Sequence, residues 1–366
     1  MVLNSEQRRV VYLSHQLGGY DGVSIEAAKW ISALDTLGFR VTPAAGKLHS
    51  SNPGPGRAGL HVPALWLPAG ATGRLLAAPP LTQAEIAAVI EAGGGPGGYA
   101  VLDNIATLPT AADNIVRLVA ALETAGMRML VRHHDPPWDG VAVRSADARF
   151  PIVPRGSRHV AISAHLREQL QVRRGVEALV LFNTLDLPSL LGGDRALSRR
   201  AAGIAPGDLV LLHPATPYPR KQVGTAARFA DAVARKWDGR VIYWLTGGST
   251  DPLAGGGRYL FKTGRSRSPA DLYAAADAVL LTSSWEGWGN PVAEGAALGL
   301  PVVTGTWPAL EEMRKLGVRD IPVAAPDAVP RLIAELDGRP GHRIGELRSA
   351  LDNSRLTGDL EKLLSR

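Results

Sequence analysis

Two glutamates, Glu286 and Glu294, are separated by seven residues in the stretch LLTSSWEGWGNPVAEGAALGLPVVT. An apolar run precedes Glu286, a Gly-Trp-Gly turn follows it, and Pro291 opens a helical pattern that carries Glu294. The first carboxylate is therefore expected in a loop at the carboxyl end of a strand, where open α/β sheets bind ligands. A carboxylate can accept two hydroxyl hydrogens, and backbone N–H groups at a helix start bind phosphate. The stretch predicts a site for a ligand with hydroxyl and phosphate groups.

Polar side chains also follow apolar runs in the first half of the chain, at Asp103-Asn104 and at His133-His134. Adjacent residues of an extended chain point to opposite sides, so only one histidine is expected to face a ligand. His134, which precedes Asp135-Pro136, is the first choice and His133 the second. Adjacent histidines rarely chelate one ion, so the pair does not predict a metal site. Trp138 is a candidate for stacking on a sugar, although packing in the core is an alternative reading for each of these side chains.

Residues 280–304 resemble the donor-binding signature of the retaining GT-B glycosyltransferases of family 4. That signature runs roughly P-S-x-x-E-G-[FW]-G-x-x-x-x-E-A-x-A-x-G-x-P-V-V, and Gly295 stands where alanine usually follows the second glutamate. The resemblance implies that Glu286 contacts the hydroxyls of a donor sugar and that Glu294 binds the ribose. It also implies that the backbone of the intervening turn lines the pocket for the sugar and diphosphate, namely Gly287, Trp288, Gly289 and Asn290.

Two other segments resemble phosphate-binding parts of the same family. In the glycine-rich loop after the first strand, Gly18 and Gly19 would approach the donor diphosphate, since glycine permits positive φ and close backbone approach. In LLHPATPYPRKQV, Lys221 takes the place of the family's phosphate-binding lysine. Thr216 stands where the family has an arginine, five residues earlier, and Arg220 is the candidate to replace it. An arginine fork matches a diphosphate, whereas lysine acts as a point charge.

The resemblance also assigns catalytic and nucleotide-binding roles. The family carries a histidine at the position of His134, close to the donor sugar and the acceptor, so His134, Glu286 and Lys221 are the expected catalytic groups. Arg265 and Arg267 follow a turn where the family places the nucleotide base; Arg265 is the donor-binding candidate and Arg267 is expected at the surface. The candidate acceptor contacts are His133, Asp103, Asn104 and Trp138.

The elements that must position these residues alternate between short β-type runs and longer helical patterns, which is typical of parallel α/β architecture. A strand at Arg9–Ser14, a helix at Val23–Leu37 and a strand at Phe39–Pro43 form a β–turn–α–β unit that opens a Rossmann-like domain. Residues 47–80, rich in Pro, Gly and Ser, predict an extended loop with little regular structure. The same alternation resumes after residue 205.

The fold expected is therefore an α/β protein with two Rossmann-like βαβ domains, which the resemblance implies face each other across a GT-B cleft. We expect an acceptor-side domain over residues 1–186 and a nucleotide-sugar donor domain over residues 187–345. Residues 346–366 are expected to form a C-terminal helix that packs back on the first domain.

Composition excludes several classes of protein. The chain has 366 residues, no cysteine and 40 basic against 34 acidic side chains, so 40 − 34 gives +6. The lack of cysteine excludes disulfide scaffolds, thiolate zinc sites and a cysteine nucleophile. The basic residues are mostly dispersed arginines and form no run typical of a nucleic-acid arm. Neither a signal peptide nor a membrane-spanning segment is predicted, which favours a cytoplasmic protein with at most peripheral membrane contact. The oligomeric state stays open.

These patterns together predict transfer of a hexose from a UDP- or GDP-sugar to an acceptor hydroxyl, with retention at the anomeric carbon, which is the behaviour implied by the family. The chain contains no D-x-D, so positive side chains and backbone N–H groups, rather than a metal, would neutralise the leaving diphosphate, and no cofactor is expected. The acceptor is expected to be a small metabolite or natural product, with a glycan as a further option. The alternatives are a non-catalytic partner that binds sugar nucleotides and an NAD-dependent oxidoreductase. The glycine loop lacks the G-x-G-x-x-G spacing of the latter.

Overall fold

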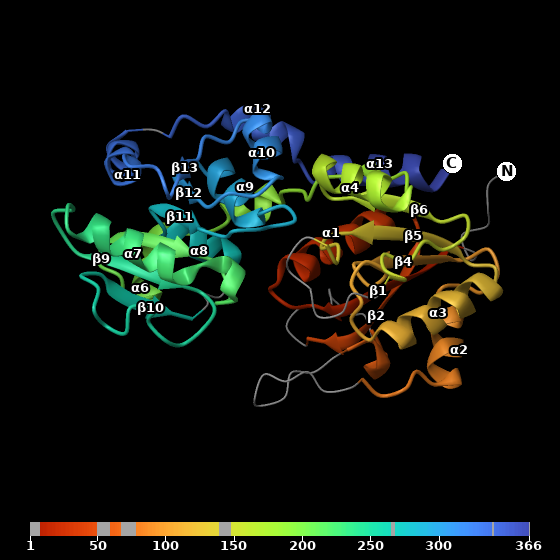
Figure 1. The fold of residues 1–366 in the computed structure, drawn as a ribbon. Coiled ribbons are helices and arrows are strands. Elements are labelled where there is room, and N and C mark those ends of the chain that lie inside the picture. The colour runs from red at the N-terminus through yellow and green to blue at the C-terminus, as the bar shows by residue number, and fades with distance from the viewer. Residues whose placement is uncertain are drawn as a thin grey trace. The chain divides into compact units, whose positions relative to one another are not determined.

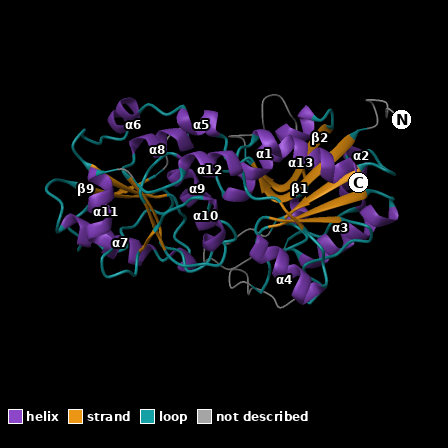
Figure 2. Cartoon of the chain, turned by 90° about the horizontal axis from the view of Figure 1, so that it is seen from above, coloured by secondary structure: helices purple, strands orange, loops and turns teal. Residues whose placement is uncertain are grey.

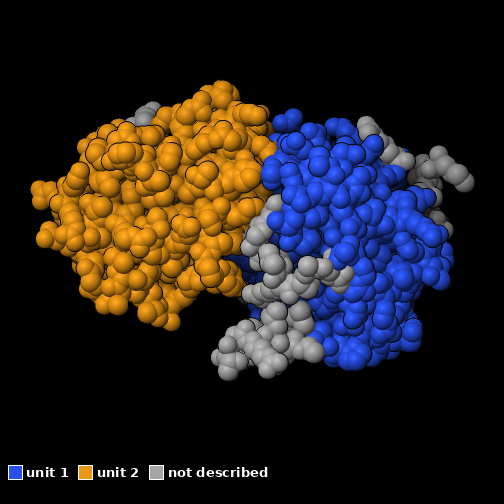
Figure 3. Space-filling model, viewed as in Figure 1, with its two compact units in different colours: residues 1–183, 353–366 blue, residues 184–352 orange. Residues whose placement is uncertain are grey.

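A computed structural model describes residues 8–49, 59–66, 78–138, 148–264, 268–338 and 340–365. The chain divides into two compact units, residues 1–183 with 353–366 and residues 184–352 (Figure 3). The sequence predicts boundaries at 186 and 345, whereas the units divide at 183/184 and 352/353. The C-terminal segment expected over residues 346–366 is thus divided between the two units. The helix α12 (Ile344–Ala350) belongs to the second unit, and α13 (Ser354–Ser365) belongs to the first.

The first unit is built on one parallel sheet with strand order β3-β2-β1-β4-β5-β6-β7 (Figure 1). Helices lie on both faces of this sheet (Figure 2). The strands are β1 (Arg9–Leu17), β2 (Arg40–Leu48), β3 (Leu60–His61), β4 (Tyr99–Asp103), β5 (Arg128–His133), β6 (Arg158–Ala161) and β7 (Leu179–Val180). Besides α13, the helices are α1 (Gly22–Thr36), η2 (Pro63–Leu65), α2 (Gln83–Ala92), α3 (Ala112–Thr124) and α4 (Ala164–Arg174).

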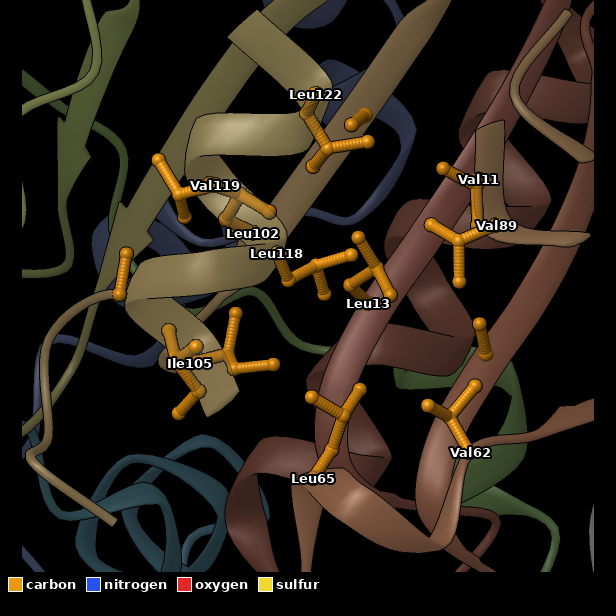
Figure 4. Packing of buried hydrophobic residues seen from close by; sticks show 14 of the residues in the cluster. Val11, Leu13, Val62, Leu65, Val89, Leu102, Ile105, Leu118, Val119 and Leu122 are labelled. Atoms are coloured by element: carbon orange, nitrogen blue, oxygen red, sulfur yellow. The ribbon is translucent and has the colours of Figure 1, made fainter. Parts of the chain in front are cut away.

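Alternation along β1 distributes its side chains between two cores, because successive residues of a strand face opposite sides of the sheet. Val11 and Leu13 pack into a cluster that α2 and α3 cover (Figure 4). Val10 and Tyr12 face the other side, where the cluster includes Trp30 of α1 and residues of α13. The sheet is therefore buried on both faces, as parallel sheets are.

The register of the central strands aligns their carboxyl ends. Leu13 of β1 is paired with Leu102 of β4, and Asp103 of β4 with Arg132 of β5. The polar residues that end β4 and β5 consequently lie along one edge of the sheet, which is the ligand-binding edge of open α/β sheets.

The second unit has a parallel sheet of its own, with strand order β10-β9-β8-β11-β12-β13. Its strands are β8 (Leu209–His213), β9 (Val241–Leu245), β10 (Leu260–Thr263), β11 (Ala278–Leu281), β12 (Val302–Thr304) and β13 (Ile321–Pro322). The remaining helices are α5 (Leu187–Leu191), α6 (Arg195–Ala201), η3 (Pro219–Lys221), α7 (Val223–Ala234), α8 (Pro269–Ala275), α9 (Asn290–Ala297), α10 (Leu310–Leu316) and α11 (Ala328–Asp337). The two sheets confirm the expectation of an α/β chain with two Rossmann-like halves.

The loop predicted for residues 47–80 is wrong in part. Within its described residues, β3 extends the sheet and η2 follows it, and Val62, Ala64 and Leu65 are fully buried in the first core. These isolated apolar residues form too short a pattern to show periodicity, and their burial depends on contacts with β2, α2 and α3. The rest of the segment lies outside the described residues.

Candidate functional site

Two cationic side chains converge on Glu286 in the second unit. Glu286 lies in the loop after β11, and Arg220 and Lys221 lie in η3, beyond the carboxyl end of β8. Glu286 Oε1 accepts hydrogen bonds from Lys221 Nζ and Ser283 Oγ, each at 2.5 Å, and Oε2 accepts one from Arg220 Nη1 at 2.8 Å. The sequence singles out all three charged residues separately, and the structure brings them into one cluster.

Opposite charge keeps this cluster ionised although Glu286 is only 8% exposed. Burial by itself would raise the pKa of Glu286, but Lys221 and Arg220 beside it lower the pKa below its ordinary value. The cluster thus holds two cations against one carboxylate. The surplus positive charge lies where an anionic ligand can compete for the two cations.

Hydrogen bonds between the two loops hold the cluster in place. Ser284 N donates to Arg220 O at 2.8 Å, Thr282 Oγ1 donates to Lys221 O at 3.1 Å, and Arg220 Nη1 also donates to Trp285 O at 3.0 Å. Because these contacts include backbone groups on both sides, the loops carry the three charged side chains in a defined arrangement.

The turn between the two glutamates requires glycine at Gly289. Gly289 precedes α9 with φ of 109°, and a Cβ there would lie 2.8 Å from the indole of Trp307. Trp307 Nε1 donates in turn to Trp288 O at 2.9 Å. The side chain of Trp288 is buried, so this residue offers its backbone to the turn. Gly287 and Asn290 complete the turn at the N-terminus of α9.

Glu294 is oriented by a residue that the sequence did not single out. It lies on α9 and accepts a hydrogen bond from the hydroxyl of Tyr273, a buried residue of α8. Burial and the adjacent Glu294 raise the pKa of Tyr273 well above its ordinary value, so its hydroxyl remains a donor. Tyr273 lies in a helix of ordinary apolar pattern, and nothing in its sequence context marks it.

His213 is a second residue that sequence reasoning missed. It ends the apolar strand β8, is fully buried, and its Nδ1 lies 2.9 Å from the hydroxyl of Tyr243. Burial, together with the charge of Lys221, lowers the pKa of His213 to about 3, while Glu286 acts in the opposite direction. A neutral imidazole therefore lies within electrostatic range of the cation cluster. The sequence feature that could have marked His213 is its place as the last residue of an apolar strand.

In the first unit, the structure places His134 against Asp103. His134 Nε2 lies 2.7 Å from Asp103 Oδ1, and Tyr12 donates its hydroxyl to Asp103 Oδ2 at 2.7 Å. Asn104, with φ of 60°, uses Oδ1 to accept from the backbone N–H groups of His134 and Asp135. Asp103 and Asn104, expected as acceptor contacts, are buried and bonded to protein groups, so they support His134 instead.

His133 points away from His134, toward protein groups. Its Nδ1 lies 2.9 Å from Thr107 Oγ1, and its Nε2 lies 2.9 Å from His159 Nδ1. Burial, with the neighbouring histidines, lowers the pKa of His133 well below its ordinary value, and burial lowers the pKa of His159 to about 4. His133 is fully enclosed, which is incompatible with the expected direct contact to an acceptor in this arrangement.

The other predicted residues lie as follows. Gly18 has φ of 77° in the loop between β1 and α1, and a Cβ on Gly19 would lie 2.9 Å from Asp21 Oδ2. Trp138 stacks with the guanidinium of Arg173, whose Cζ lies 5.4 Å from the ring centroid. Arg265 and Arg267 lie outside the described residues.

No group of three or more His, Cys, Asp or Glu side chains among the described residues could hold a metal ion. None of the helices in that part of the chain is long and apolar enough to cross a membrane.

Comparisons with known proteins agree with these features. Residues 210–337 match the family model described as glycosyl transferases group 1. The chain is 30% identical over 207 residues to D-inositol 3-phosphate glycosyltransferase of Actinosynnema mirum, covering 52% of this chain and 46% of that protein. It is 26% identical over 223 residues to mannosylglucosylglycerate synthase of Thermotoga maritima, covering 50% of this chain and 52% of that protein. The chain thus spans about half the length of the curated relatives it matches.

The fold is shared along nearly the whole chain. The structure of Anabaena HepE in complex with UDP and glucose superposes with a TM-score of 0.68 at 16% identity, covering 98% of this chain and 99% of that chain. The Glu286 and Glu294 stretch lies inside the family match, and both units lie inside the structural match. Residues 210–337 therefore resemble the group 1 glycosyltransferases, and the chain shares the fold of solved GT-B glycosyltransferase structures.

Proposed function

We propose that this protein transfers a hexose from a nucleotide diphosphate sugar to the hydroxyl group of an acceptor. The observation that carries the proposal is the cluster of Arg220 and Lys221 around Glu286. It offers two cations for a diphosphate and one carboxylate for sugar hydroxyls, within the segment that matches the glycosyltransferase family.

The cluster binds such a donor by exchange of partners. Arg220 and Lys221 are paired with Glu286 in the structure. A diphosphate carries more negative charge than one carboxylate, so it draws both cations toward its oxygens. Glu286 is then released to accept hydrogen bonds from hydroxyls of the sugar. Glu294, held by Tyr273, is the proposed partner of the ribose.

Retention and metal independence belong to the same proposal. Arg220, Lys221 and the N–H groups at the start of α9 supply the positive charge that the leaving diphosphate needs. We propose front-face attack, in which the acceptor oxygen bonds to the anomeric carbon while the C–O bond to the diphosphate breaks. The leaving phosphate oxygen takes the acceptor proton. This route requires no protein nucleophile, and it leaves the anomeric configuration unchanged.

The acceptor is proposed to be a small metabolite or natural product. The first-unit helices α2 and α3 carry one basic residue between them, Arg117, which does not favour an acidic lipid surface. For the same reason we place the protein in the cytoplasm, with its substrates free in solution.

A donor panel tests the proposal. Thermal shift with UDP-, GDP- and NAD-type ligands is followed by mass spectrometry of cell extract incubated with the stabilising donor, with EDTA present. We expect stabilisation by a nucleotide diphosphate sugar and a product heavier by one hexose. Lys221→Ala and Glu294→Ala should abolish turnover, whereas Lys236→Ala, which removes an exposed lysine of the same unit, should not. Binding without product would support a non-catalytic partner, and stabilisation by NAD alone would support an oxidoreductase.

A further inference from the structure

Beneath the His134 edge of the first unit lies a group of charges in which Glu26, Asp103 and Arg132 are fully buried. Arg132 Nη2 donates to Glu26 Oε2 at 3.2 Å and to Asn183 Oδ1 at 2.9 Å, and its Nη1 lies 3.7 Å from Asp103 Oδ2. Glu26 is also paired with Lys29. We call Glu26, Lys29, Asp103 and Arg132 the buried charge group. Burying each ion costs several kcal/mol before pairing, so such a group is weak evidence for stability and calls for another role.

The charges of this group balance without His134. Glu26 and Asp103 contribute two negative charges, and Lys29 and Arg132 contribute two positive charges. In its neutral form, the imidazole of His134 has one N–H and one nitrogen with a lone pair. Among the described residues, the charged groups in contact with this imidazole or with its partner carboxylate are Asp103 from β4 and Arg132 from β5, and His133 is next to His134 in the chain.

The hydrogen bonds to Asp103 then determine which nitrogen of His134 carries the proton. Burial by itself would raise the pKa of Asp103, but the charge of Arg132 and the hydrogen bonds from His134 and Tyr12 lower it below its ordinary value, so the carboxylate is ionised and can only accept. The hydroxyl of Tyr12 donates a hydrogen bond to Asp103 Oδ2. The contact of 2.7 Å between Oδ1 and His134 Nε2 must therefore be an N–H donated by the imidazole.

The other nitrogen of His134 is left with its lone pair. Nδ1 of His134 has no hydrogen-bond partner among the residues described, and it is not among the fully enclosed polar atoms there. It is thus a hydrogen-bond acceptor that a ligand can reach, at the carboxyl edge of the sheet.

His15 shows the opposite arrangement on β1, which β4 separates from β5 in the sheet. Its Nδ1 lies 2.9 Å from Leu65 O, and a carbonyl oxygen only accepts, so Nδ1 carries the proton. The Nε2 of His15 is enclosed and has no partner in the described structure. The two histidines therefore provide an internal comparison of tautomers within one unit.

We propose that Asp103 and Tyr12 are positioning residues that hold His134 as the Nε2–H tautomer, so that its Nδ1 accepts a hydrogen bond from a substrate hydroxyl. The substrate role rests on the proposed function, whereas the tautomer does not. A site built to accept from a hydroxyl rejects analogues that lack it, because its acceptor is then left unpaired. His134 would thereby select for one hydroxyl group of the donor sugar or of the acceptor.

The first test is spectroscopic and needs no substrate. In ¹⁵N-histidine-labelled protein in mildly alkaline buffer, long-range ¹H–¹⁵N correlations distinguish the two tautomers, and His134→Gln identifies the signals of His134. We expect the Nε2–H pattern for His134 and the Nδ1–H pattern for His15. In Asp103→Asn the His134 signals should lose the single tautomer while those of His15 stay unchanged. An Nδ1–H or mixed pattern for His134 in the unsubstituted protein would overturn the proposal.

The second test uses turnover with the preferred donor. Asp103→Asn should lower kcat about 10- to 100-fold, as loss of a hydrogen bond to a charged group does. Tyr12→Phe, which keeps every charge of the group, should lower kcat less and serves if Asp103→Asn fails to fold. Once His134→Gln is present, adding Asp103→Asn should cause no further loss, because both act through one imidazole. Additive losses would show that Asp103 acts in another way.

Deoxy analogues then identify the source of the hydroxyl. If the hydroxyl belongs to the donor, one deoxy-sugar donor should be turned over more slowly than the normal donor by the unsubstituted protein. In His134→Gln, that deoxy donor and the normal donor should be turned over at the same rate. If it belongs to the acceptor, the same result is expected with one deoxy acceptor. Equal additional losses in His134→Gln with every analogue would overturn the substrate role. Absence of turnover with every donor would contradict the proposed function, while the tautomer measurement would stand.

Discussion

The two units of this chain handle charge in opposite ways. In the second unit, Arg220 and Lys221 keep 24% and 14% of their side chains exposed and meet Glu286 in loops. In the first unit, Arg132, Glu26 and Asp103 are fully buried and are carried by strands and a helix. The charges of the second unit can exchange partners with a ligand, whereas those of the first unit cannot do so without unpairing a buried charge. The difference separates charges that bind from charges that position.

The largest expected effect is on the stability of the first unit. Arg132→Met leaves Glu26 and Asp103 without their shared cation, and breaking a buried pair in this way costs about 3–5 kcal/mol. Arg220→Met in the second unit should cost about 1 kcal/mol or less, because Glu286 keeps Lys221 and the Arg220 side chain is 24% exposed. Urea unfolding, followed in the first unit through Trp30 next to Arg132, measures both variants. Equal losses of unfolding free energy in the two variants would contradict the distinction between buried charges in the first unit and exchangeable charges in the second.

Acid should affect the first unit through His133 and His159. The unfolded chain binds a proton at each of these histidines near pH 6.5, whereas burial lowers the pKa of His159 to about 4 in the folded state. The contribution is therefore fully present above pH 6.5 and is lost as the pH falls toward 4, with a loss of about 3 kcal/mol for His159.

His213 behaves similarly in the second unit, with its pKa lowered to about 3. The loss from His213 should therefore continue to lower pH than the loss from His159. Unfolding of the unsubstituted protein and of His159→Leu across this range of pH measures the effect. An unchanged acid sensitivity in His159→Leu would show that the imidazole pair is not the cause.

The smallest expected effect is on donor binding through Glu294. Tyr273→Phe removes one hydroxyl from this carboxylate and leaves the buried ring in place. We expect donor affinity to fall by about 1 kcal/mol, or roughly fivefold, with little change in stability. Tyr259→Phe, which removes a hydroxyl bonded to Asp251 elsewhere in the unit, is the matched control. Equal affinities of the two variants would argue against a role for Tyr273 in positioning Glu294.

The same contrast explains which parts could be predicted from the sequence. Glu286 and Glu294 occupy one contiguous motif and Lys221 lies in a second short segment, so the resemblance of each segment to the family makes these residues recognisable. The buried charge group draws its members from α1, β4 and β5, and Tyr12 joins it from β1. Nothing local in the sequence pairs Tyr12 with Asp103, because their contact depends on the order of strands in the sheet.

The elements themselves were largely predictable, with β2 as the instructive exception. The sequence predicts a strand that ends at Pro43, whereas β2 continues to Leu48 through Ala44 and Ala45. Small residues have low β propensity, but here burial between the two cores overrides it. Gly46 shows the same control by packing, since a Cβ there would lie 2.5 Å from Trp66. The long helices and the apolar strands of the second unit could be predicted from their local sequence patterns.

The central claim is that the cation cluster of the second unit binds the diphosphate of a sugar nucleotide. Titration calorimetry of the preferred donor with the unsubstituted protein, Lys221→Ala and Lys236→Ala tests it most directly. We expect equal affinity for the unsubstituted protein and Lys236→Ala, and affinity about 10- to 100-fold lower for Lys221→Ala, because a charge-assisted contact is lost. Equal affinity of all three proteins for the donor would contradict the account.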